Sequence, residues 1–185
     1  MRTLKYAILG LLNQSSMTGY DLMKEFESAL TEFWYAKHSQ IYPELKKLTD
    51  EGCVSYEIQI TGVSLEKKLY AITDKGREDF MNWLSENSKL PVTPKDVSKL
   101  KVFYSGALSE ELRQEMFRDQ LEQHKARLQH LEENMKKFRK IPARDSHEFG
   151  DYLLLHGAIM REKTTCEWLA ECIELSRENP QSTIM

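Results

Sequence analysis

The sequence predicts a mainly α-helical protein with one small β-hairpin, divided into two domains at about residue 90. Three observations lead to this prediction. Apolar residues recur at helical spacing over most of the 185 residues. Strict alternation of apolar and polar residues is confined to residues 54–60, which is typical of a strand with one buried face. Pro91 and Pro94 then bracket a short polar connection, and helical periodicity continues beyond it.

Three helices are predicted in the first fifty residues. Residues 3–13 carry a broad apolar face, and Thr18 can cap a second helix that extends to about residue 30. The third helix is capped by Ser39 or a neighbour, and Pro43 is expected in its first turn, where a missing N–H costs least. Its apolar stripe consists of Ile41, Leu45 and Leu48.

A hairpin and a fourth helix are predicted to follow. Gly52 supplies the left-handed residue expected beyond the end of a helix. The strand over residues 54–60 and a second strand over residues 69–72 flank a segment too long for a two-residue turn, so we expect a projecting loop with Lys67 and Lys68 beside it. Helix, helix, helix, hairpin, helix is the order of a winged helix-turn-helix domain, which we place at residues 1–90.

Residues 91–185 are predicted to form an α-helical domain. A helix over residues 94–106 precedes a long one, capped by Ser109, that runs to about residue 140, and the last helix begins after Ser146 or Asp145. A heptad seam on the long helix consists of Phe117, Leu121, His124, Leu128, Leu131, Met135 and Phe138. So small a domain cannot bury such faces alone, so we expect a homodimer through these C-terminal helices. The alternative is a monomeric antiparallel helical hairpin.

The composition is that of a globular protein and limits the classes of function. Apolar residues are 41% and charged residues 30%, no apolar run approaches the roughly 18 residues that span a membrane, and no secretion signal is seen. We therefore expect a cytoplasmic protein with no membrane partner. The net charge is −3, and residues 1–90 carry 11 basic against 13 acidic side chains. This balance argues against indiscriminate coating of nucleic acid, so a DNA-binding surface must come from local placement of charge.

Motifs typical of enzymes and metal sites are absent from the sequence. It contains no GxxxxGK(S/T) phosphate loop, no GxGxxG after a strand, no HExxH and no GxSxG. The five histidines are scattered, and the three cysteines show no CxxC spacing and no neighbouring histidine at ligand spacing. We therefore expect no catalytic residues, no metal and no cofactor.

Four segments together resemble the PadR family of bacterial transcriptional regulators. They are residues 4–12 (LKYAILGLL), 18–22 (TGYDL), 39–48 (SQIYPELKKL) and 69–76 (LYAITDKG). The helices beyond residue 90 resemble the longer-tailed, phenolic-acid-responsive members, so the resemblance covers essentially the whole chain. It implies a dimeric repressor whose third helices enter successive major grooves of a near-palindromic operator in double-stranded DNA.

The resemblance and side-chain chemistry together assign DNA contacts. Gln40 can pair bidentately with adenine, and Ser39 can bond several base edges. Lysines and the backbone at the start of the second helix would hold phosphates, which fixes register without reading sequence. The expected DNA-binding residues are Thr18, Tyr20, His38, Ser39, Gln40, Tyr42, Pro43, Lys46, Lys67 and Lys68. The alternative is a solvated helix face and a charged hairpin on a winged-helix protein-interaction module that does not bind specific DNA.

The resemblance also implies an effector, a small phenolic acid. Its site must stack an aromatic ring and neutralise or hydrogen-bond a carboxylate. Candidates lie where the two domains should meet: Tyr6, Trp34, Tyr35, His156, Met160 and Arg161. For the aromatic residues the alternative is core packing, and for His156 it is a hydrogen-bonded interface histidine.

Overall fold

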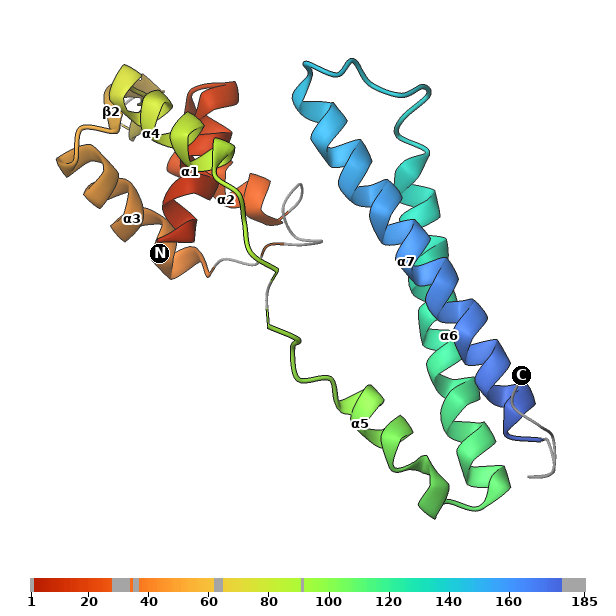
Figure 1. Cartoon of the computed structure of the whole chain (residues 1–185). Helices are drawn as coiled ribbons and strands as arrows, with labels where there is room; N and C mark the ends of the chain where they lie inside the picture. Colours follow the sequence, from red (N-terminus) through yellow and green to blue (C-terminus); the bar gives the residue numbers. More distant parts are fainter. Residues whose placement is uncertain (1, 28–33, 35–36, 62–64, 91, 178–185) are drawn as a thin grey trace. The chain divides into compact units, whose positions relative to one another are not determined.

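The computed structural model divides into two compact units, residues 1–90 and 91–185 (Figure 1). It describes residues 2–27, 34, 37–61, 65–90 and 92–177. The elements of unit 1 are α1 (Thr3–Gln14), β1 (Met17–Thr18), α2 (Gly19–Glu27), α3 (His38–Asp50), β2 (Val54–Thr61), β3 (Leu65–Ile72) and α4 (Asp74–Ser85). Those of unit 2 are α5 (Val97–Phe103), a 3-10 turn η1 (Ser105–Ala107), α6 (Glu110–Met135) and α7 (His147–Leu175). The prediction of a mainly helical chain with an N-terminal winged helix is confirmed.

The core of unit 1 lies among its helices and the base of its sheet. The stripe predicted on α3 is confirmed, because Ile41, Leu45 and Leu48 are all 0% exposed. They pack with apolar side chains of α1 and α2, and burial of each such side chain is worth about 1.5–3 kcal/mol. α3 therefore has one wholly buried side, which leaves its opposite side to solvent.

The sheet of unit 1 has three antiparallel strands in the order β1-β3-β2. The two-residue strand β1 pairs with β3 and was not predicted, because so short a strand has no periodicity. β3 begins at Leu65, not at residue 69 as predicted, so Lys67 and Lys68 lie on a paired strand opposite Gln59 and Ile58. Pairing with β2 holds residues 65–68 in extended conformation, although these residues show no alternation of apolar and polar side chains.

The hairpin projects beyond the core, which corrects the expectation of one buried face along the first strand. Val54 is 2% exposed, but Ile58 is 58% and Ile60 74% exposed. Only the base of the hairpin therefore packs on the helices. The outer half is a wing with an apolar and aromatic side.

α3 ends in a Schellman motif. The Cys53 N–H donates to the Leu48 carbonyl at 2.9 Å, and the Gly52 N–H donates to the Thr49 carbonyl at 3.0 Å. Gly52 has φ 70°, as predicted, and it is the single residue with positive φ in the described ranges. A left-handed residue here allows the chain to pass directly from α3 into β2.

The start of α4 is bonded to that same turn. The Thr73 hydroxyl donates to the Gly52 carbonyl at 2.7 Å and accepts the Gly76 N–H at 3.1 Å, which caps α4. The Lys75 ammonium donates to the Glu51 carbonyl at 2.6 Å. A Cβ on Gly76 would overlap the backbone carbonyl of Cys53. The end of α3, the start of β2 and the start of α4 are therefore held at one point.

Charged side chains tie α1 to α3 and α4. Arg2 donates from Nε and Nη2 to Glu44 Oε1 at 2.9 and 2.6 Å, and it also pairs with Glu51. Glu44 is 7% exposed, so Arg2 supplies the partner that a buried carboxylate requires. Lys5 lies 3.6 Å from Glu51 and also pairs with Asp79 on α4.

In unit 2, α6 and α7 form an antiparallel hairpin and lie side by side along their length (Figure 1). Two separate apolar clusters join them. The first contains Phe117, Leu169 and Ile173, and the second contains Leu131, Leu155 and Ile159. The seam predicted on α6 is therefore covered by α7 of the same chain.

A polar contact separates the two clusters. His124 Nδ1 lies 2.6 Å from Glu162 Oε2, and Arg127 Nε lies 3.1 Å from Glu162 Oε1. The prediction placed His124 on the apolar seam, and its neighbour across the hairpin is this carboxylate.

Two boundaries in unit 2 differ from the prediction. α6 ends at Met135, about five residues early, and α5 is shorter than expected because Asp96 caps it. No helix in the described ranges is long and apolar enough to cross a membrane.

Replacement of Gly76 by alanine should destabilise unit 1. The new methyl group would meet a backbone oxygen that cannot rotate away, and overpacking of this kind costs about 1–3 kcal/mol. We expect Gly76→Ala to lower the free energy of unfolding by that amount, measured by urea unfolding. The control is Gly150→Ala, where a Cβ meets nothing within 4 Å. Equal midpoints for Gly76→Ala and wild type would contradict the prediction.

Acidification should weaken the ion pairs of Glu51. The Arg2 guanidinium holds the pKa of the Glu51 carboxyl below its ordinary value. Such a carboxylate stabilises the fold above its unfolded pKa, and this contribution is lost as pH falls through the folded pKa. At neutral pH we expect wild type to exceed Glu51→Gln in free energy of unfolding by about 1 kcal/mol or less, because the pair is partly exposed.

The difference between wild type and Glu51→Gln should shrink below about pH 4. Urea unfolding over a pH series measures it, and Glu78→Gln, an exposed carboxylate on α4, is the matched control. A difference that is constant with pH would show that the charge of Glu51 is not what stabilises the fold.

Candidate nucleic-acid interface and ligand cavity

The solvent side of α3 presents a polar and aromatic row. Ser39, Gln40, Pro43 and Lys46 are exposed, and Tyr42 is 51% exposed. All five were expected to face away from the core. His38 is the first residue of α3, and its side chain lies outside the described part of the structure.

The start of α3 differs from the prediction in two respects. Lys37, not Ser39, precedes the first helical residue, so Pro43 is the sixth residue of α3 and lies inside the helix. Because proline has no N–H, the Ser39 carbonyl lacks its helical donor four residues on. The Gln40 side-chain carbonyl accepts the Lys37 N–H at 3.3 Å. A bond this long is weak, so the Gln40 amide can exchange it for another partner.

The start of α2 lies beside α3. The Thr18 hydroxyl donates to Asp21 Oδ2 at 2.7 Å and accepts the Asp21 N–H at 3.2 Å, which confirms Thr18 as the cap. The Thr18 N–H also donates to Asp21 Oδ2, at 3.1 Å. The hydroxyl and the N–H of Thr18 together hold the pKa of the Asp21 carboxyl below its ordinary range. Tyr20 is 57% exposed, and the Lys24 ammonium lies 4.7 Å from its ring centroid.

The wing adds lysines to this surface. The Lys68 ammonium lies 4.1 Å from the ring centroid of Tyr56 on β2, a cation–π contact of about 0.5–1 kcal/mol at an exposed site. Lys67, its neighbour on β3, is exposed. The ring of Tyr56 therefore holds Lys68, one of the three predicted phosphate-binding lysines, in place.

One cavity of about 450 Å³ brings five predicted DNA-binding residues together. We call it the tyrosine–lysine cavity, and its lining residues are Thr18, Gly19, Tyr20, Tyr42, Glu66, Lys67, Lys68 and Tyr70. The two lysines give it positive charge, which Glu66 offsets in part. Burial raises the pKa of Tyr70, so this hydroxyl stays protonated near neutral pH. The cavity opens between the exposed row of α3 and the wing.

Three residues with long-range contacts in unit 1 escaped the sequence analysis. Arg2 and Glu44 lie 42 residues apart in sequence, so no local pattern reveals their pairing. Tyr56 was assigned to a buried strand face. A cross-strand register that pairs it with Tyr70, and places Lys68 two residues along, would have revealed its role.

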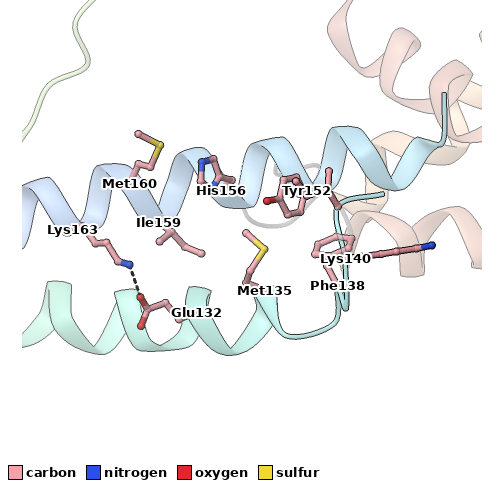
Figure 2. Close-up of a pocket in the computed structure, with 10 residues that line it drawn as sticks. Glu132, Met135, Phe138, Lys140, Tyr152, His156, Ile159, Met160 and Lys163 are labelled. Carbon is pink, nitrogen blue, oxygen red and sulfur yellow. Dashed lines mark ion pairs between the residues drawn. The ribbon is translucent and has the colours of Figure 1, made fainter. Parts of the chain in front are cut away.

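Unit 2 contains a second cavity, between the end of α6 and the start of α7. Its volume is about 620 Å³, and we call it the hairpin cavity. Its lining residues are Glu132, Met135, Phe138, Lys140, Ile141, Tyr152, His156, Ile159, Met160 and Lys163. Figure 2 shows Met135, Tyr152 and Ile159 between the two helices, whereas Met160 points to the outer side of α7.

Aromatic rings and charges meet in the hairpin cavity. Tyr152 stacks on His156 with centroids 6.0 Å apart, and Phe138 meets Tyr152 edge-on at 5.6 Å. Lys163 forms an ion pair with Glu132 at 3.0 Å across the cavity. Stacking surfaces beside lysines are the groups that an aromatic carboxylate requires.

The structure assigns the other effector candidates to different surroundings. Tyr6 stacks on Trp83 at 4.5 Å, and its hydroxyl lies 3.5 Å from Asp79. Trp34 packs against the core of unit 1, and among the described residues its buried indole N–H has no acceptor. Arg161 is exposed on α7, and Tyr35 lies outside the described residues. No group of His, Cys, Asp and Glu in the described ranges could hold a metal ion.

The three-helix core, the wing and the exposed third helix define a winged-helix protein. Residues 8–82 match the Transcriptional regulator PadR-like family, and residues 94–177 match the C-terminal region described as Virulence activator alpha C-term. The negative transcriptional regulator PadR of Bacillus subtilis is 42% identical over 178 residues, which are 95% of this chain and 98% of the relative. This chain belongs to the PadR-like family of transcriptional regulators, so the resemblance inferred from its four motifs is confirmed.

Two solved structures of the Bacillus subtilis PadR are similar over nearly the whole chain. One is a complex with operator DNA, with a TM-score of 0.88 and 43% identity over 95% of this chain and 99% of the other. The second is a complex with p-coumaric acid, with a TM-score of 0.85 and 40% identity over 96% of this chain and 100% of the other.

Proposed function

We propose that this protein is a dimeric repressor that binds a near-palindromic operator in double-stranded DNA. The observation that carries the proposal is the division of α3: one side is 0% exposed at Ile41, Leu45 and Leu48, and the other presents a polar row beside the tyrosine–lysine cavity. A helix of this kind fits a major groove. The similar PadR of Bacillus subtilis has been solved with operator DNA.

Base contacts would come from Ser39 and Gln40 near the start of α3. Gln40 would give up its weak bond to the Lys37 N–H and present both amide groups to an adenine. Pro43, His38 and the ring of Tyr42 would touch neighbouring bases or sugars, which leaves the Tyr42 hydroxyl for the phosphates. These few contacts recur in each half-site, so the near-neutral charge of unit 1 is compatible with specific binding.

Phosphate contacts would surround the tyrosine–lysine cavity. Lys46, Lys67 and Lys68 supply charge, and the hydroxyls of Tyr20 and Tyr42 supply neutral donors. The backbone at the start of α2 adds N–H groups. The Glu66 carboxylate would turn away from a bound phosphate, because like charges repel.

A second copy would bind unit 2. The heptad seam is already covered by α7, so other apolar residues must form the dimer interface. The exposed ones in unit 2 include Val97, Leu100, Phe103, Tyr104, Leu112, Leu153, Leu154, Met160 and Trp168. An exposed apolar surface of this extent is typical of an interface, and two-fold pairing is the commonest solution. The dimer would place two α3 helices about one turn of DNA apart, roughly 34 Å.

A small aromatic acid would relieve repression. We propose that the hairpin cavity contributes to its site, because a ring can stack beside His156 and a carboxylate can meet Lys140 or Lys163. Tyr6, Trp34, Tyr35 and Arg161 stay candidates from sequence alone. The protein would act by binding in the cytoplasm, without catalysis or a cofactor.

The alternative, a winged-helix protein-interaction module, has one observation in its favour. Ile58 and Ile60 are exposed on the wing, and an exposed apolar surface suits a protein partner. Such a module would show no preference for any DNA sequence at any salt concentration.

Substitutions at Gln40 and Lys68 should affect DNA binding in different ways. In a mobility-shift titration on DNA upstream of the gene and its neighbours, we expect Gln40→Ala to lose about 1–3 kcal/mol of binding free energy, and to lose it at one base position of each half-site. Lys68→Ala should weaken binding to all DNA sequences alike. It should also lower the slope of log K against log salt concentration by about one counterion per half-site. Glu167→Ala on α7 is the control. Stoichiometry should be two chains per operator. No sequence-preferring complex would end the repressor proposal.

Addition of p-coumaric or ferulic acid to the complex should release the DNA. We expect His156→Ala to raise the acid concentration for half-release by about fivefold, because a ring contact is worth about 1 kcal/mol. Its affinity for operator without acid should match that of Glu167→Ala. If His156→Ala released the DNA at the same acid concentration as wild type, the acid would bind elsewhere. If no aromatic acid released the DNA from the wild-type complex, only the effector proposal would be wrong.

A further inference from the structure

A contact between Gly19 and Tyr42 joins the first residue of α2 to the exposed side of α3. A Cβ built on Gly19 would lie 2.5 Å from Tyr42 Cε1, 2.9 Å from Cζ and 3.0 Å from the hydroxyl oxygen. Any side chain at position 19 would therefore overlap the outer half of the ring. The ring of Tyr42 occupies the space that a larger residue would need.

Backbone conformation does not explain the glycine at position 19. Gly52 is the single residue with positive φ in the described ranges, so Gly19 has a conformation that alanine can adopt. Gly76 offers the contrast, because a Cβ there would meet a fixed backbone carbonyl. At Gly19 the obstacle is the far end of a side chain, which can move. Alanine at position 19 should therefore displace the Tyr42 ring and leave the fold intact.

The position of the Tyr42 ring matters for the tyrosine–lysine cavity. Tyr42 projects from α3 and is half exposed, yet its ring edge rests on the first residue of α2. Its hydroxyl therefore lies at the junction of α2 and α3, in the same cavity as Lys67 and Lys68. A ring free to rotate would lose conformational entropy when it bound a phosphate, and a ring already held there loses less.

We infer that Gly19 is a positioning residue for DNA binding: its missing side chain seats Tyr42 against the start of α2, where the hydroxyl and the lysines bind one phosphate group. The inference rests on the proposed function, since it concerns how the same surface holds DNA. Gly19 acts through Tyr42, and the contribution of each depends on the other.

A double-mutant cycle tests this dependence. We expect Gly19→Ala to weaken operator binding, measured by fluorescence anisotropy, by about tenfold or more, because a hydrogen bond to a charged group is worth about 1.5–3 kcal/mol. Tyr42→Ala should weaken it at least as much. The double variant should bind no more weakly than Tyr42→Ala, since Gly19 has no other route to the DNA. Gly150→Ala is the matched control, because position 150 is far from this surface in sequence and an added Cβ there meets nothing within 4 Å.

A measurement without DNA separates this inference from the proposed function. In protein labelled with 3-fluorotyrosine, the ¹⁹F resonance assigned to Tyr42 by Tyr42→Phe should move in Gly19→Ala, and the urea midpoint should stay within error of wild type. Additive losses in the cycle, an unmoved resonance, or wild-type affinity of Gly19→Ala would overturn the inference. If wild type itself formed no specific complex, the proposed function would fail, and the resonance would still report whether Gly19 seats Tyr42.

Discussion

The turn at residues 51–53 is the constraint on which the arrangement of unit 1 depends. Three elements meet there: α3 ends in a left-handed glycine, β2 starts at the next residues, and α4 is bonded to the turn through Thr73 and Lys75. The carbonyl of Cys53 accepts the Thr73 N–H at 3.1 Å and leaves no room for a side chain on Gly76. The angle between α3 and the wing is therefore set by backbone bonds, which deform little. A surface that contacts both a groove and its flanking phosphates, as we propose for α3 and the wing, would benefit from this rigidity.

The net charge of unit 1, counted along the sequence, does not describe the charge at the surface beside α3. Glu44, Glu51 and Asp79 are paired with Arg2 and Lys5, and Asp21 is bonded to Thr18. The ion pairs lie on the α1 and α4 side, where Arg2 and Lys5 offset two of the three negative charges, whereas the Asp21 carboxylate keeps its charge at the start of α2. The lysines of the wing are left to set the local potential beside α3. Because several acidic side chains are used in these ion pairs, a unit with a net negative charge can still present a positive surface to the phosphates that we propose it contacts.

Local signals in the sequence were sufficient for most of the fold. The stripe at Ile41, the left-handed Gly52 and the cap at Ser109 depend on neighbours within about one turn of helix, so pattern alone reveals them. Pairing between distant segments could not be predicted in this way. β1 has only two residues, and the first half of β3 has no strand pattern of its own and is extended because it pairs with β2. The candidate site divides along the same line. The exposed row of α3 follows from helical periodicity, whereas the seat of Tyr42 on Gly19 depends on the packing of two helices.

The polar contact in the middle of the α6–α7 hairpin has a mechanical consequence. Two apolar clusters alone would tolerate a slip of one helix by a turn, because aliphatic side chains interchange with little loss. Glu162 is 14% exposed and has its partners His124 and Arg127 at one register, and a slip would leave a largely buried carboxylate unpaired at a cost of several kcal/mol. The hairpin is therefore locked along its axis. Along the roughly 43 Å of α7, we therefore expect the two helices to shift together and not to slide past one another.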